Sequence, residues 1–324
     1  MLKNVPAALK LSNRKIVYNV ISREDGMSRA DIARKTGISG ATVIKIAEYL
    51  AAQNIISYDP SESVSMPGRK PSPIRFNGDF VYIIVIYMEG FYISLSIVNA
   101  VGEVVLSRDL KVANTEHFFQ DDFYAQIDSI IASSDIDRKR LIGIGVAIPA
   151  AVDPVSRRVY RAPLFHDTRL ANLKMILDEL GSRYSLPVFV ENDVNAAAYG
   201  EYRRVYSEFT DALVYISLGS GLGGGLILNR KLWKGQNASA GEVGYMLFDP
   251  HRQSAAPGRS QNEGLGWLES KINVTALKDK FDFDIQAPLD RQKGIKIARY
   301  LSRYLALSVL NIYAVLDIKT VVLG

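Results

Sequence analysis

The beginning of the chain carries apolar side chains at helical spacing. In "NRKIVYNVI" they recur at i, i+1, i+4 and i+5, which predicts one buried helix face made of Ile16, Val17, Val20 and Ile21. In "GATVIKIAEYLAAQ" a second inner face is made of Val43, Ile46, Ala47 and Leu50. Further along, "NIISYDP" and "IRFN" have the short apolar runs of strands. The pattern predicts helices followed by a strand and a return strand.

Polar residues mark the ends of these helices. In "SRADIARKTG" the Ser28 hydroxyl can accept from the Asp31 amide while Asp31 reaches back, which is a capping box. Gly37 follows as a helix-ending residue, and Ser39 can cap the next helix. Two short helices around a tight glycine turn are typical of a helix-turn-helix, and the two strands would form its wing.

From residue 78 onward, strand-length and helix-length segments alternate. "YIIVIYM", "YISLSIVNA" and "EVVLSRDL" predict a strand meander, and "LPVFVENDVNAAAYGEYRR" predicts a buried strand that runs into a helix. "GIKIARYLSRYLALSVLNIYAVLD" predicts a long helix with one apolar face. Strand meanders joined to crossover helices indicate an α/β body with two halves.

The stretch "ISLGSGLGGGLILN" is rich in glycine. Gly219, Gly221 and Gly224 satisfy G-x-G-x-x-G, but that pattern marks a dinucleotide site only when it opens a helix. The residues that follow, "GLILNRKLW", are β-branched and apolar and predict a strand. The glycines are therefore expected to join two strands of a hairpin, and a Rossmann site is excluded.

Composition narrows the class of protein. The 324 residues include no cysteine, which excludes disulfides, thiolate zinc sites and cysteine nucleophiles and fits a reducing cytoplasm. The N-terminal segment lacks the apolar core of a signal peptide, and no apolar run has the length of a membrane span. We therefore expect a soluble, cytoplasmic protein with no membrane partner.

The positive charge is concentrated in the first quarter of the chain. Residues 1–77 hold twelve Lys and Arg against six Asp and Glu, a balance of +6, whereas residues 78–324 have a balance of −1. Such asymmetry is expected when one end of a protein meets a polyanion. Chance clustering of surface lysines is the alternative on charge alone. Together with the helical pattern, the charge favours double-stranded DNA as a partner.

The start of the third predicted helix supplies candidate DNA contacts. Ala41, Thr42 and Lys45 point away from its inner face. A small side chain can approach a thymine methyl group, and lysine can reach a guanine edge or a phosphate. Arg29 and Ser39 complete this candidate set. The alternative for each residue is an ordinary solvated helix position.

A basic segment, "SMPGRKPSP", lies between the predicted wing and the body. Its Pro and Ser residues are typical of a linker. Arg69 and Lys70 also make it a narrow cationic segment suited to the minor groove, where arginine meets the most negative potential. Both interpretations remain open.

Six stretches stand out along the chain: "LSNRKIVYNVI…SRADIARKTGISGATV", "GRKP", "GIGVAIPAAVDP", "VFVENDVNAAAYGE", "SLGSGLGGGLILNRKLWKGQNASAGEVGYM" and "WLES". Together they resemble the motifs of the ROK family, which contains sugar-responsive repressors and sugar kinases, and the N-terminal end is similar to the xylose-repressor branch. The resemblance implies an actin-like, ribonuclease H-like ATPase fold with two lobes and a sugar in the cleft between them. It also implies that members continue beyond Gly324, so the body is expected to be C-terminally incomplete, as a shortened chain or a truncated gene product.

The chain departs from the family's kinases at the phosphate loop. Where those have D-x-G-x-T, this chain reads "YMEGF", with Tyr87, Glu89 and Phe91 at the aspartate, a glycine and the threonine. A carboxylate there would repel nucleotide phosphates, and the aromatic rings crowd a tight turn. Because the chain resembles the family but lacks this phosphate loop, we expect a protein that is not an enzyme and needs no cofactor.

A second departure concerns the zinc site that the family usually has. Tyr245 stands at the histidine, and Ser260, Asn262 and Trp267 stand where cysteines would be. None of them is a useful zinc ligand, so no structural zinc is expected. Apolar packing through Leu265, Trp267 and Leu268 is expected in its place.

The family's sugar-contacting positions are better matched. A sugar ring in a cleft needs carboxylates and amides for adjacent hydroxyl groups. The matching residues are Asn192, Asp193, Glu242, Tyr245 and Glu269. In the kinases the aspartate matched by Asp193 is the general base; without ATP it would serve only as a hydrogen-bond acceptor. Asn192 and Asp193 would also suit a helix N-cap, a use that is compatible with binding.

These features lead to one expected function. We expect a repressor with three parts. They are a winged helix-turn-helix in residues 1–62, a return strand and linker in residues 63–77, and a sugar-binding and dimerisation body in residues 78–324. It would bind operator DNA as a homodimer and respond to a carbohydrate inducer. An ATP-dependent sugar kinase with a DNA-binding domain, and a DNA-binding protein blind to sugar, are the alternatives.

Overall fold

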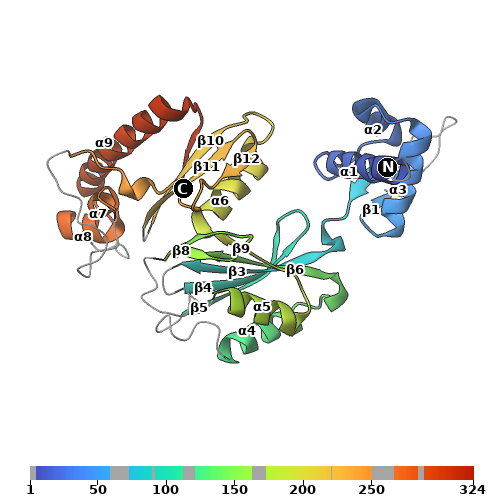
Figure 1. Ribbon diagram of the computed structural model, residues 1–324, viewed down its shortest axis with the longest axis horizontal. Coiled ribbons are helices and arrows are strands. Elements are labelled where there is room, and N and C mark those ends of the chain that lie inside the picture. Colours follow the sequence, from blue (N-terminus) through green and yellow to red (C-terminus); the bar gives the residue numbers. More distant parts are fainter. Residues whose placement is uncertain are drawn as a thin grey trace. The chain divides into compact units, whose positions relative to one another are not determined.

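The computed structural model describes residues 5–58, 73–89, 92–111, 121–162, 173–219, 221–249, 266–283 and 288–324 (Figure 1). The chain forms two compact units. The first comprises Met1–Ile84, Ser96–Leu106 and Ile131–Ile142; the second comprises Val85–Leu95, Ser107–Ile130 and Gly143–Gly324.

Three helices open the first unit: α1 (Val5–Ile21), α2 (Arg29–Thr36) and α3 (Gly40–Ala52). The predicted capping is confirmed. The Ser28 hydroxyl accepts from the Asp31 amide at 3.2 Å, and the Asp31 carboxylate accepts from the Ser28 amide at 3.4 Å. Gly37 ends α2 with φ +69°, a conformation that favours glycine, and the Ser39 hydroxyl accepts from the Thr42 amide.

A small apolar core holds these helices to an antiparallel pair of strands, β1 (Ile56–Tyr58) and β2 (Ile74–Phe76), in which Ile56 pairs with Phe76. The predicted inner face of α3 is confirmed. On α1 the prediction is wrong at Ile16, which is 40 % exposed. Successive helix positions are 100° apart, so a face centred on Val17 and Ile21 turns its neighbour outward. The buried core residues are Val17, Ile21, Ile32, Val43, Ile46, Ala47, Leu50, Ile56 and Ile74.

A five-stranded sheet has the order β5-β4-β3-β6-β9, so the predicted meander of adjacent strands is confirmed. Helices α4 (Asp121–Ala132) and α5 (Leu173–Tyr184) lie side by side on one face (Figure 1) and are joined by the Arg183–Asp128 ion pair. The prediction of a buried strand is confirmed for one face of β9, where Val188 and Val190 are buried, but β9 forms the sheet edge and Phe189 on its other face is 68 % exposed. The strands are β3 (Tyr82–Glu89), β4 (Tyr92–Asn99), β5 (Val104–Lys111), β6 (Leu141–Ile148) and β9 (Val188–Asn192).

The glycine-rich stretch forms the predicted hairpin, in which β10 (Leu213–Leu218) pairs antiparallel with β11 (Leu222–Leu228). These strands belong to a sheet of order β12-β11-β10-β13, completed by β12 (Lys231–Trp233) and β13 (Val321–Leu323). Helix α6 (Asp193–Glu201) packs directly on β11 (Figure 1). A Cβ atom on Gly225 would lie 2.3 Å from the Cβ of Ala198, so this packing requires glycine.

The predicted long helix is confirmed as α9 (Arg291–Leu316), which packs on this second sheet. Trp267 contacts Phe248 and Tyr304 edge-on, and Leu268 is fully buried, so the expected apolar packing is confirmed at these two positions. Leu265, Ser260 and Asn262 lie outside the described residues. The smaller elements are β7 (Ala151–Val152), β8 (Val159–Arg161), a π-helical turn (Tyr202–Tyr206), α7 (Glu269–Ile272) and α8 (Val274–Phe281).

Among the helices that the structure describes, none combines the length and the apolar character needed to cross a lipid bilayer.

Candidate functional site

A cavity of about 230 Å³ lies in the second unit, between the ends of β3, β6 and β9 and the β10–β11 hairpin. The five residues that the sequence predicts to contact a sugar all line it: Asn192, Asp193, Glu242, Tyr245 and Glu269. They come from the end of β9, the first turn of α6, the loop before α7 and the start of α7. The fold therefore gathers residues that are far apart in the sequence around one concave site.

Asn192 both caps α6 and positions its neighbour. Its side-chain oxygen accepts from the Asn195 amide at 2.9 Å, which confirms the N-cap expectation. Its side-chain amide donates to the Ala150 carbonyl at 3.2 Å and to the Asp193 carboxylate at 3.0 Å. These bonds tie the end of β9 to the segment that follows β6 and hold Asp193 at the cavity wall.

The environment of Asp193 disfavours its negative charge. Burial raises the pKa of Asp193 to about 6, and the nearby carboxylates of Glu89 and Glu242 act in the same direction. Amide hydrogen bonds, including one from Val194 at 2.9 Å, oppose this rise. The group thus titrates close to neutral pH and can accept a proton or a hydrogen bond from a ligand.

Glu269 is held against the hairpin. The Glu269 carboxylate accepts from the backbone amide of Leu222 at 3.2 Å. A Cβ atom on Gly221 would lie 2.8 Å from the same carboxylate, so the close approach depends on glycine. Glu242 precedes the 3₁₀ turn Val243–Tyr245, which places Tyr245 on the cavity wall.

The residues at the family's zinc positions do not fit that metal. Tyr245 presents a phenol to the cavity, and Trp267 is enclosed by aromatic rings; neither side chain is a zinc ligand. Within the described ranges no three His, Cys, Asp or Glu side chains are grouped so as to hold a metal ion.

The candidate DNA contacts on α3 lie on its outer side. Ser39, Ala41 and Lys45 are exposed, whereas Thr42 is partly buried and its hydroxyl lies 2.9 Å from that of Ser39. Arg29 is exposed on α2, and its guanidinium carbon lies 4.8 Å from the Tyr58 ring centroid of β1. Arg69 and Lys70 lie outside the described residues.

A comparison with models of protein families identifies the family of this chain. The model of the ROK family matches residues 83–324. The chain belongs to the ROK family. It is 29 % identical over 243 residues to the xylose repressor of Bacillus subtilis (strain 168), a match that covers 74 % of this chain and 62 % of that protein. The chain thus spans about three fifths of the length of the xylose repressors that it matches.

Solved structures show the same ROK fold. A ROK family transcriptional regulator, described as a homologue of the Escherichia coli MLC protein, has a TM-score of 0.74 at 21 % identity, covering 98 % of this chain and 83 % of that one. A ROK glucokinase from Streptomyces griseus, in complex with glucose and AMPPNP, has a TM-score of 0.57 at 23 % identity, covering 75 % and 82 %. The body is therefore a mixed α/β, actin-like fold of the sugar-kinase type.

Tyr87 and Glu89 of the stretch "YMEGF" line the same cavity as the five residues predicted to contact a sugar. The Tyr87 hydroxyl donates to Glu89 at 3.2 Å, and the Glu89 carboxylate lies 3.6 Å from where a Cβ on Gly219 would be. Burial, with Glu89 and Asp193 nearby, raises the pKa of Tyr87. A carboxylate therefore faces the glycine turn of the hairpin. Gly90 and Phe91 lie outside the described residues.

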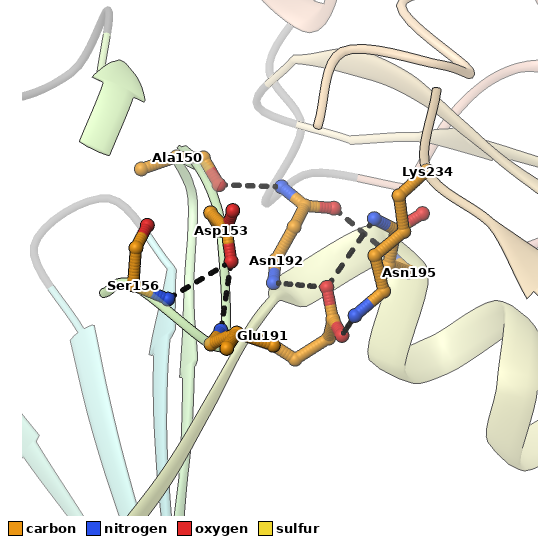
Figure 2. A network of polar contacts seen from close by, with 8 residues as sticks. Ala150, Asp153, Ser156, Glu191, Asn192, Asn195 and Lys234 are labelled. Carbon is orange, nitrogen blue, oxygen red and sulfur yellow. Dashed lines mark hydrogen bonds and ion pairs between the residues drawn. The ribbon is translucent and has the colours of Figure 1, made fainter. Parts of the chain in front are cut away.

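A polar network behind the ROK cavity was not predicted from the sequence (Figure 2). The Glu191 carboxylate accepts from the Asn192 amide at 3.1 Å and from the Asn195 side chain at 3.4 Å, and it forms an ion pair with Lys234. Asn195 also lines the cavity, as do Tyr215 and Ser217 of β10. Tyr215 and Ser217 could have been found from the sequence, because residues two apart on a strand point to the same face of the sheet.

Proposed function

We propose that this chain is a sugar-responsive transcriptional repressor that is not an enzyme. The observation that carries the proposal is the union of two features. The N-terminal helices, including α3 with its exposed outer side, precede the segment that matches the ROK family. The cavity lined by the residues expected to contact a sugar lies within that segment. The relatives support this: several are xylose repressors, and one structural neighbour is a ROK transcriptional regulator.

The DNA-binding part is a winged helix-turn-helix made of α1, α2, α3 and the β1–β2 pair. Its recognition helix is α3, whose first turn is fixed by the Ser39 cap so that Ala41, Thr42 and Lys45 face the major groove. Arg29, stacked on Tyr58, contacts the DNA backbone next to the wing. The positive balance of residues 1–77 provides the attraction to phosphates.

Two recognition helices are needed for a palindromic operator, so the repressor acts as a homodimer. We assign residues 1–62 to the DNA-binding domain, residues 63–77 to the return strand and a linker that follows the minor groove, and residues 78–324 to the body. This organisation belongs to the cytoplasm, where the operator and the inducer meet.

The inducer is a carbohydrate bound by Asn192, Asp193, Glu242, Tyr245 and Glu269 in the cavity. It favours one arrangement of the two halves of the body over another, and this population shift changes the spacing of the two DNA-binding domains. Asp193 serves as a hydrogen-bond acceptor for a sugar hydroxyl. Asp193→Ala should leave DNA binding intact and abolish the response to inducer, and a normally induced variant would contradict the assignment.

A sugar kinase is the second candidate, because a carboxylate with a pKa of about 6 suits a general base. Against it stands Glu89, whose charge faces the turn that would hold nucleotide phosphates. Incubation with ATP and a panel of sugars, followed by measurement of ADP, separates the two functions. We expect no sugar-dependent ADP; its formation would favour the kinase.

Selection of DNA sequences from a random library by the full chain tests the repressor directly. We expect enrichment of a palindromic site, and we expect Thr42→Ala combined with Lys45→Ala to abolish that enrichment. Glu48→Ala, on an exposed position of the same helix outside the candidate set, is the control and should retain it. Failure of the wild-type chain to enrich any sequence would contradict the proposed function.

A further inference from the structure

The first turn of α6 carries a buried acceptor that lacks a donor. Asn195 is 3 % exposed and lines the cavity, as do Asn192 and Asp193 before it. Its side-chain oxygen has no hydrogen-bond partner within the described part of the chain. A buried carbonyl oxygen without a donor is unfavourable, so a ligand that supplies an O–H or N–H group would be stabilised here.

The orientation of the Asn195 amide is fixed by Glu191. The NH2 group of Asn195 donates to the Glu191 carboxylate at 3.4 Å, and the oxygen points to the other side (Figure 2). An ionised carboxylate can only accept hydrogen bonds, so turning the amide over would place two acceptors against each other. The Asn195 oxygen is therefore held away from Glu191.

Glu191 is itself held from two further directions. Its Oε1 atom accepts from the Asn192 backbone amide at 3.1 Å, and its Oε2 atom forms the ion pair with Lys234 (Figure 2). The ion pair joins the end of β9 in one sheet to the residue that follows β12 in the other. Because both carboxylate oxygens are engaged, Glu191 stays in place as the acceptor for Asn195.

The close packing of α6 on the hairpin keeps Asn195 in this position. The helix residues Val194 and Ala198 lie against glycines of β11. A Cβ atom on Gly223 would lie 2.8 Å from a methyl carbon of Val194, and one on Gly225 would lie 2.3 Å from the Cβ of Ala198. A helix packed this closely holds its side chains in place, so the donor for Asn195 is expected from the contents of the cavity.

We propose that Asn195 is a further sugar-binding residue that determines specificity. Its side-chain oxygen accepts a hydrogen bond from one hydroxyl group of the sugar, and Glu191 is the positioning residue that keeps this oxygen turned toward the sugar. The cavity thereby selects sugars that carry a free hydroxyl group at that ring position. The inference rests on the proposed binding of a sugar in this cavity and names the feature by which that sugar is selected.

Isothermal titration calorimetry of the full chain with deoxy sugars tests the contact. The probes are D-glucose, D-galactose, D-mannose and D-xylose and, for each sugar that binds, the derivatives in which one hydroxyl group at a time is replaced by hydrogen. Loss of the hydroxyl group that faces Asn195 should weaken binding to the wild type about tenfold, because it leaves a buried acceptor unpaired.

Asn195→Leu removes both polar groups with little change of volume. The parent sugar should bind this variant about tenfold more weakly, and the deoxy sugar identified with the wild type should bind it as well as the parent sugar does, within about twofold. Asn311→Leu, at an exposed position on α9, is the same exchange outside the cavity and should alter neither affinity nor preference. Thermal unfolding checks that each variant is folded, and Asn195→Ala is the second variant if leucine prevents folding.

Glu191→Gln tests the positioning role. Lys234 would keep the glutamine oxygen on its own side, so the glutamine NH2 group would face Asn195 and turn the Asn195 oxygen away from the sugar. The affinity for the parent sugar should fall about tenfold. If Glu191 acts through Asn195, the double variant of Glu191→Gln and Asn195→Leu should bind as Asn195→Leu alone does, within about twofold.

The outcomes separate this inference from the proposed function. The role of Asn195 is overturned, and the sugar-binding function left standing, if no deoxy sugar loses affinity for the wild type or if folded Asn195 variants keep the wild-type preferences. Complete loss of binding in both folded Asn195 variants overturns it as well, since one hydrogen bond cannot account for that loss. Binding of none of the sugars to the wild type overturns the sugar response and this inference with it. Additive losses in the double variant overturn the positioning role of Glu191.

Discussion

Replacing Gly225 by alanine should force α6 away from β11 and destabilise the body. The new Cβ would lie 2.3 Å from the Cβ of Ala198 and 3.3 Å from the Val194 carbonyl oxygen. Carbon atoms in favourable contact are about 3.5–4.0 Å apart, so the helix would have to move by roughly 1 Å. Overpacking of this kind costs about 1–3 kcal/mol in the free energy of unfolding. Because Asp193 begins α6, the same movement would disturb the cavity.

Gly200 provides the matched control on the same helix. A Cβ atom there would meet nothing within 4 Å, and the residue is exposed. Gly200→Ala adds the same methyl group and should instead stabilise the chain by about 0.5–1 kcal/mol, because glycine is unfavourable within a helix. The two substitutions are thus expected to have opposite signs.

Urea unfolding followed by tryptophan fluorescence measures both effects. The chain has two tryptophans, Trp233 and Trp267, and both belong to the second unit, so the signal reports on the body. The midpoint should fall for Gly225→Ala and rise for Gly200→Ala. A Gly225→Ala protein that unfolds at the wild-type urea concentration or above would refute the close packing of α6 on the hairpin.

Three further substitutions test local features. Ser28→Ala removes the cap of α2 and should cost about 1 kcal/mol of stability, measured by circular dichroism during thermal unfolding; an unchanged melting temperature would contradict the capping role. Asn192→Ser keeps a capping oxygen but loses the separate amide NH2 group that donates to Ala150 and Asp193, so the free energy of sugar binding measured by calorimetry should weaken by more than the free energy of unfolding, and an equal affinity would show that Asn192 acts only as a cap. The folded-state pKa of Asp193, about 6, exceeds its ordinary value of 3.8, so the folded chain binds this proton more tightly and stability falls as the pH rises from about 4 to about 6. Asp193→Asn removes this penalty and should be more stable than the wild type at pH 7, by up to about 3 kcal/mol, with a difference that shrinks at pH 4; denaturant midpoints at the two pH values check it, and a pH-independent difference would contradict it.

Local signals in the sequence were sufficient for the helix ends and the hairpin. The Ser28–Asp31 capping box, the glycine that ends α2 and the strand pair around Gly219 depend on neighbours within a few residues, and each is present in the structure. The spacing of apolar residues predicted burial less reliably. It wrongly placed Ile16 on the buried face of α1, and it did not show that the strand carrying Phe189 lies at the edge of its sheet. Those properties are set by distant elements.

Some residues of the candidate site could be predicted from the sequence, and others could be found only in the structure. Motifs located the residues of the β9–α6 junction and the α7 carboxylate, and the fold places them around one cavity. The sequence did not reveal that Glu191 pairs with Lys234, or that the buried oxygen of Asn195 has no hydrogen-bond partner among the described residues, since both depend on side-chain orientation across separate segments. Glu89 was interpreted as a defect in a phosphate loop, and only the three-dimensional arrangement shows that it shares a cavity with Asp193.

The central claim is that one chain couples sugar binding to DNA binding. The most direct measurement is fluorescence anisotropy of the selected DNA site bound to the full chain, titrated with D-xylose and with the neutral, amine and N-acetyl forms of glucose, galactose and mannose. We predict that at least one sugar lowers the affinity for DNA in the wild type and has no effect in Asp193→Ala, although both proteins bind the site equally well without sugar. Specific DNA binding that no sugar alters, or the same sugar effect in Asp193→Ala, would contradict the account.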